Sequence, residues 1–100
     1  MVKLKIFGIM EEKFEYVFAD GTTVQVSKGE DGYHVHLYKE GEEPLMGTYT
    51  DFKKMVLDIG ENFLWWRGLN NEYDKLAIKL RRLNPKYTRI DIYCWLCGEE

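Results

Sequence analysis

The chain has 100 residues, of which 45% are hydrophobic and 31% are charged, and its formal net charge is −3. This length suits one domain over residues 1–100, because two halves would each be too small to bury a core, and this composition excludes disorder. No apolar run approaches the roughly 18 residues of a membrane helix, and the alternating residues 2–6 differ from a signal peptide. We therefore expect a soluble cytoplasmic protein without a membrane partner.

Strands are predicted in the first half of the chain. Apolar and polar side chains alternate there, as in half-buried strands, in five runs: 2–6, 14–18, 22–26, 33–38 and 45–49. Asp20-Gly21 separates two of these runs, and this dipeptide favours a tight hairpin turn because both residues tolerate positive φ. The sequence predicts an antiparallel meander of about four strands.

Two helices are predicted after the meander. The first has Thr50 as its candidate N-cap and carries an apolar stripe of Phe52, Val56, Ile59 and Phe63, which Gly60 interrupts. The second has Asn70-Asn71 as its candidate cap and an apolar stripe from Tyr73 to Leu83, and it ends at Asn84-Pro85.

The last apolar run predicts a strand. Thr88, Ile90, Ile92 and Cys94 alternate with more polar or larger side chains, which indicates a C-terminal strand that returns to the sheet. Together with the meander and the two helices, this defines an α+β fold in which the helices cover one face of the sheet.

Two cysteines and two histidines form a candidate metal site. Cys94 and Cys97 have the spacing of a zinc knuckle, and His34 and His36 project from the same face of one strand. The alternative is that Cys94 packs in the core and the protein has no cofactor, because one isolated Cys-x-x-Cys is a weak signal. We expect no cofactor and keep zinc as the alternative. A redox role is disfavoured, because too few residues follow Cys97 to place either thiol at a helix N-terminus.

A basic stretch is a candidate nucleic-acid interface. No acidic residue occurs between Lys75 and Arg89, a segment that contains six basic residues: Lys75, Lys79, Arg81, Arg82, Lys86 and Arg89. Lys75, Lys79 and Arg82 have helical spacing and would line one side of the second helix. The negative net charge favours the alternative of a solvated helix face, so nucleic acid is the secondary expectation.

Trp65-Trp66-Arg67 is the candidate partner-binding site. Neighbouring side chains diverge, so both tryptophans cannot enter one core, and tryptophan and arginine are frequent interface anchors. The alternative is a second tryptophan that covers the edge of the core. With a single serine, Ser27, and no phosphate-cradling loop, we expect no enzyme but a protein-binding domain. A small inhibitor or adaptor of phage or mobile-element type, acting on a larger bacterial machine, is compatible with the length, mild acidity and aromatic content.

Overall fold

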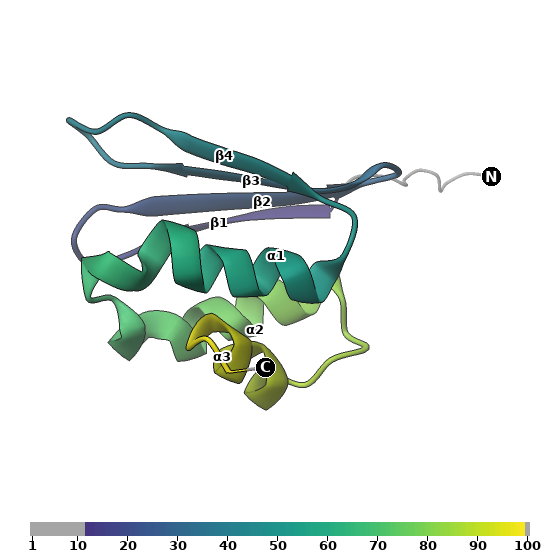
Figure 1. The fold of residues 1–100 in the computed structure, drawn as a ribbon. Helices are drawn as coiled ribbons and strands as arrows, with labels where there is room; N and C mark the ends of the chain where they lie inside the picture. The colour runs from purple at the N-terminus through teal and green to yellow at the C-terminus, as the bar shows by residue number, and fades with distance from the viewer. Residues whose placement is uncertain (1–11, 100) are drawn as a thin grey trace.

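The computed structural model describes residues 12–99, and it has the expected α+β arrangement of a sheet followed by helices (Figure 1). The run at 2–6 that predicts a strand lies outside these residues. The sheet and the helices form two layers, with the helices on one face of the sheet (Figure 1).

Four antiparallel strands form the sheet in the order of the sequence. They are β1 (Glu12–Val17), β2 (Thr23–Gly29), β3 (Gly32–Tyr38) and β4 (Leu45–Tyr49). The predicted meander is therefore confirmed. Short loops join each strand to its neighbour, which is the simplest way to pair consecutive antiparallel strands.

The turn between β1 and β2 forms where the Asp-Gly pair predicts it. The Asp20 carboxylate accepts hydrogen bonds from the backbone N–H of Thr22 at 2.9 Å and from its hydroxyl at 3.0 Å. Gly21 has a φ of 92°, which a residue without a Cβ adopts at little cost. The aspartate and the glycine thus contribute separately to the turn.

The second layer is helical. It contains α1 (Phe52–Asp58), the π-helical segment η2 (Ile59–Leu64), the short 3₁₀ turns η3 (Trp65–Arg67) and η4 (Asn70–Glu72), α2 (Tyr73–Leu83) and α3 (Arg89–Leu96). Both predicted helices are present, and the first continues through Gly60 into η2. Within residues 12–99, no helix is long and apolar enough to cross a membrane.

The core lies between the two layers. Alternate residues of β2 and β3, namely Val24, Val26, Val35 and Leu37, are at most 2% exposed, and they point toward the helices. Each helix contributes residues three or four positions apart, such as Met55 and Ile59 in α1 and η2 or Leu76 and Leu80 in α2. These contacts join the sheet and all three α-helices in one hydrophobic cluster.

The predicted N-caps of the first two helices are wrong. Asp51, not Thr50, occupies the N-cap position of α1, and its side chain makes no capping hydrogen bond. Glu72, not an asparagine, occupies that position in α2. The Glu72 carboxylate instead accepts hydrogen bonds from the Tyr16 hydroxyl at 2.9 Å and the Ala19 N–H at 3.1 Å. It fastens the start of α2 to the end of β1.

The predicted C-terminal strand is also wrong, because residues 89–96 form α3. Thr88 caps this helix by accepting a hydrogen bond from the Asp91 N–H at 3.1 Å. At its other end, Gly98 has a φ of 89°, and the N–H groups of Gly98 and Glu99 return to the carbonyls of Trp95 and Cys94.

Burial explains why the alternation in this segment was misleading. Ile92, Trp95 and Leu96 are the buried residues of α3, and their spacing of three and four is helical. Ile90, which the strand pattern places with Ile92, is 63% exposed. The period-two pattern therefore came from an apolar residue that stays at the surface.

Candidate functional site

Trp65 and Trp66 lie together at the surface, on the turn η3. Their exposed fractions are 68% and 52%, and the two rings meet edge to face with centroids 6.1 Å apart. We call this pair the tryptophan ridge. The sequence predicts only one exposed tryptophan here, whereas both rings are more than half exposed and neither belongs to the core.

A buried leucine lies on each side of the tryptophan ridge in the sequence. Leu64 precedes it and is fully buried, and Leu69 follows it and is 6% exposed. Gly68 ends η3 between the ridge and Leu69, with a φ of 68° in the left-handed region. With a buried leucine on either side, the exposed indoles are attached to a backbone that the core restrains.

The Arg67 side chain is not part of the exposed surface of the ridge but packs beneath it. Its side chain is only 6% exposed, and its guanidinium pairs with Glu42 at 2.9 Å while its Nε donates to the Phe63 carbonyl at 3.0 Å. The guanidinium carbon also lies 5.3 Å from the centroid of the Trp66 ring. Arg67 therefore connects the ridge to the loop between β3 and β4.

A hollow of about 360 Å³ lies beside Trp65. It is lined by residues from the helical layer: Gly60, Glu61, Trp65, Asn70, Tyr73, Leu96, Cys97 and Gly98. Its walls combine an indole, a buried phenol ring and an exposed carboxylate, Glu61. A side chain with an apolar stem and a cationic end is the type that these walls accommodate.

The four residues of the candidate zinc site lie in different layers. Cys94 is on α3, Cys97 follows its last residue, and the two are not joined in a disulfide. His34 and His36 are on β3 and point away from the helices. Within residues 12–99, no group of three or more potential metal-ligating side chains is close enough to hold one ion. Burial, with a contribution from Glu99, raises the pKa of the Cys94 thiol.

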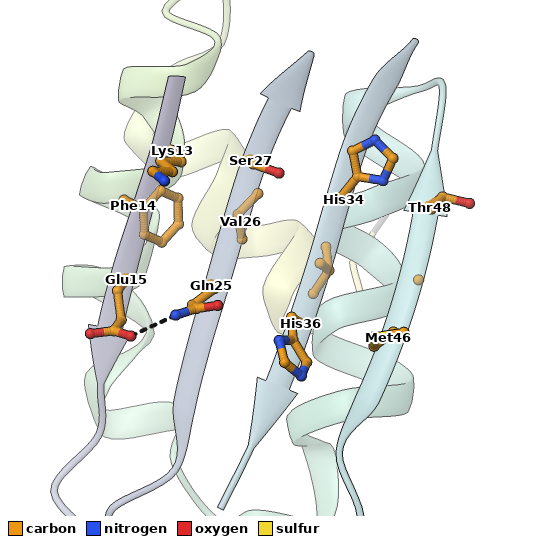
Figure 2. A pocket seen from close by; sticks show the side chains of 12 residues that line it. Lys13, Phe14, Glu15, Gln25, Val26, Ser27, His34, His36, Met46 and Thr48 are labelled. Atoms are coloured by element: carbon orange, nitrogen blue, oxygen red, sulfur yellow. Dashed lines mark hydrogen bonds between the residues drawn. The ribbon is translucent and has the colours of Figure 1, made fainter. Parts of the chain in front are cut away.

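The sheet face that carries the histidines presents polar and charged side chains together with exposed Met46, and it forms a shallow depression of about 670 Å³ (Figure 2). Gln25 donates to Glu15 at 2.8 Å, which lowers the pKa of that carboxyl, and the His34 ring lies 3.3 Å from Asp31. In Figure 2 the labelled side chains stand in rows across the strands. Glu15 thus has a hydrogen-bond partner on the neighbouring strand of this face.

The six basic residues of the candidate nucleic-acid interface do not form one surface. Arg81 and Arg82 from α2 and Arg89 from α3 line a common hollow of about 570 Å³. Lys75 and Lys79 lie nearer the start of α2 and do not line it. Lys86 is in the loop between the helices, with its Nζ 5.5 Å from the centroid of the Tyr87 ring.

Sequence reasoning missed several residues of these surfaces. Glu42 is 25 positions from its partner Arg67, and no local pattern connects the two. Ile78, Ile90 and Tyr93 are 43%, 63% and 37% exposed near the arginines. The strand pattern placed Ile90 on the buried face, and it assigned no site to Ile78 or Tyr93. The capping pattern of Thr88 with Asp91 was the signal that could have placed α3 and these residues correctly.

Comparison of the chain with protein-family models, with curated proteins and with solved structures found no match.

Proposed function

We propose that this chain is a non-enzymatic protein-binding domain whose contact site is the tryptophan ridge. The observation that carries the proposal is the exposure of two adjacent indoles on a restrained turn. An indole ring buries a large apolar area when a partner covers it, and tryptophans are prominent among the residues that dominate binding free energies. Because the turn is restrained, little conformational entropy remains to be lost on binding.

The acidic residues near the ridge favour a partner that carries basic groups. Glu42 keeps a 44% exposed side chain while it pairs with Arg67, and Glu43 and Glu61 are exposed nearby in sequence. Carboxylates at the rim of an aromatic contact attract cationic side chains and accelerate association. The partner we propose presents an apolar pocket that is flanked by lysine or arginine.

Arg67 has a positioning role in this proposal. Its nearly buried guanidinium holds Trp66 from one side, so the side chain supports the contact surface without joining it. The sequence alone placed Arg67 with the tryptophans as a contact residue.

Within this class, we propose an inhibitor or adaptor that acts on a larger bacterial assembly in the cytoplasm, of the kind that phages and mobile elements encode. The negative net charge, the aromatic content and the two unpaired cysteines support this narrower proposal.

The test is affinity capture from a lysate of the source cells, with identification of the captured proteins by mass spectrometry. The tagged protein and the variants W65A, W66A and W65A/W66A are compared with Met46→Ala, which removes a 75% exposed apolar side chain from the opposite face of the sheet. We expect one set of proteins that the wild type and M46A retain and the double variant loses. Retention of that same set by W65A/W66A contradicts the proposal.

A further inference from the structure

The arginine hollow is a second surface, distinct from the tryptophan ridge. It is lined by Ile78, Arg81, Arg82, Pro85, Thr88 and Arg89, and none of these residues is acidic. It lies along the C-terminal half of α2 and the start of α3, whereas the hollow beside Trp65 includes the first residue of α2. The two surfaces therefore lie at opposite ends of α2.

The three guanidinium groups are held differently. Arg81 donates through Nε to the Tyr87 carbonyl at 3.1 Å, and Arg89 pairs with Asp74. Arg82 makes no hydrogen bond or ion pair with another residue in the range 12–99, and it is exposed. The terminal nitrogens of Arg81 remain available as donors. Arg81 and Arg82 therefore present two guanidinium groups that, among residues 12–99, no carboxylate pairs with.

Thr88 adds a neutral donor to this hollow. Its hydroxyl oxygen accepts the Asp91 N–H, which leaves the hydroxyl proton available to another acceptor. A planar guanidinium group can donate two parallel hydrogen bonds to two oxygens of a phosphate. A hydroxyl group can donate one more hydrogen bond to the same phosphate. The hollow thus carries the kinds of donor that bind phosphate oxygens.

An aromatic and apolar surface adjoins the hollow. A smaller depression of about 310 Å³ is lined by Asp74, Arg89, Ile90 and Tyr93, so Arg89 belongs to both. Exposed Tyr93 offers a ring on which a nucleobase can stack, and Ile90 offers apolar contact. Guanidinium donors beside a stacking surface are the combination that binds single-stranded nucleic acid.

We propose that the arginine hollow binds the phosphate backbone of a single-stranded nucleic acid, with a base of the same strand against Tyr93. Asp74 pairs with Arg89 at the boundary between the two depressions, and this pair orients the Arg89 side chain. An acidic peptide would use the arginines but would gain nothing from the tyrosine ring.

The test is fluorescence anisotropy with a labelled single-stranded DNA of about twelve nucleotides, titrated between about 50 and 200 mM salt. Arg82→Gln is compared with Lys13→Gln, which removes the same charge from the exposed face of β1. We expect R82Q to weaken binding roughly tenfold and to reduce the slope of the salt dependence by about 0.7, while K13Q binds as the wild type does.

A second pair of variants tests the stacking contact. Tyr93→Leu is expected to weaken binding of the single strand, and Tyr93→Phe is expected to retain it, because only the ring is needed. Far-ultraviolet circular dichroism confirms that each variant keeps its helices.

Four outcomes would overturn the proposal: no binding at the lowest salt, equal losses in R82Q and K13Q, equal binding by Y93L, or displacement of the DNA by polyglutamate at matched charge. The last of these would assign the hollow to acidic peptides.

Discussion

The backbone of Gly60 in η2 lies directly against the backbone of Leu96 in α3, so closely that a Cβ at Gly60 would overlap the Leu96 carbonyl. This contact allows the first helical segment and the last helix to approach each other without a side chain between them. It also explains why a glycine is buried in the middle of a helical segment, where its flexibility is a cost.

Gly60→Ala is therefore expected to destabilise the protein by about 2 kcal/mol or more, because the added methyl group meets backbone and cannot be accommodated by a rotamer change. The usual gain in helix propensity on replacing glycine has the opposite sign and is smaller. Urea unfolding monitored by tryptophan fluorescence measures the difference. Glu61→Ala, at the exposed neighbouring position, is the control, and a G60A variant as stable as E61A would contradict the close contact.

The Arg67 side chain is expected to contribute to stability, unlike most surface arginines. Arg67→Met removes a nearly buried guanidinium and leaves the Phe63 carbonyl without its donor, which should cost about 2 kcal/mol. Glu42→Gln should cost less than about 1 kcal/mol, because its side chain is 44% exposed.

The matched control for Arg67 is Arg82→Met, at an exposed position on α2, where we expect little change. Equal stabilities for R67M and R82M by urea unfolding would show that the Arg67 contacts contribute nothing to the folded state.

Stability is expected to fall at high pH through Tyr16. Partial burial and the hydrogen bond to Glu72 raise the pKa of this phenol to about 12. Between pH 10 and about 12 the unfolded chain has lost this proton while the folded chain keeps it, so the free energy of unfolding decreases as the pH rises. Below pH 10 the stabilisation is fully present.

Tyr16→Phe removes this titrating group and should make the decrease between pH 10 and about 12 less steep. The comparison uses urea unfolding of both proteins at several pH values, and the difference between them isolates Tyr16 from the other tyrosines. Identical pH dependence in the two proteins would show that Tyr16 titrates normally.

Replacement of the histidines is expected to leave the metal content unchanged. His34 and His36 lie on the far side of the sheet from α3, whose end carries Cys94 and Cys97, so the four side chains do not surround one ion. Elemental analysis of the purified protein should find less than about a tenth of an equivalent of zinc in the wild type and in H34A/H36A. Stoichiometric zinc that the histidine variant loses would contradict this arrangement.

Most of the fold could be predicted from the sequence, because strand alternation, turn residues and helical stripes each depend on residues close together in the chain. Alternation defined β1 to β4, Asp20-Gly21 defined a hairpin, and the apolar stripe from Tyr73 to Leu83 defined α2. The C-terminal segment failed because two periodicities coexist in it. Only packing against α1, η2 and α2 decides that Ile92, Trp95 and Leu96 are buried together as one helical face.

The sequence by itself determined the strand-first α+β class and the residue types of the candidate sites, namely the tryptophan pair and the basic stretch from Lys75 to Arg89. Tertiary structure decided how those residues are grouped. Helix formation at residues 89–96 brings Arg89 beside Arg81 and Arg82, and the two-layer arrangement separates His34 and His36 from Cys94 and Cys97. These outcomes depend on contacts between residues far apart in the chain, and periodicity within a short window carries no information about such contacts.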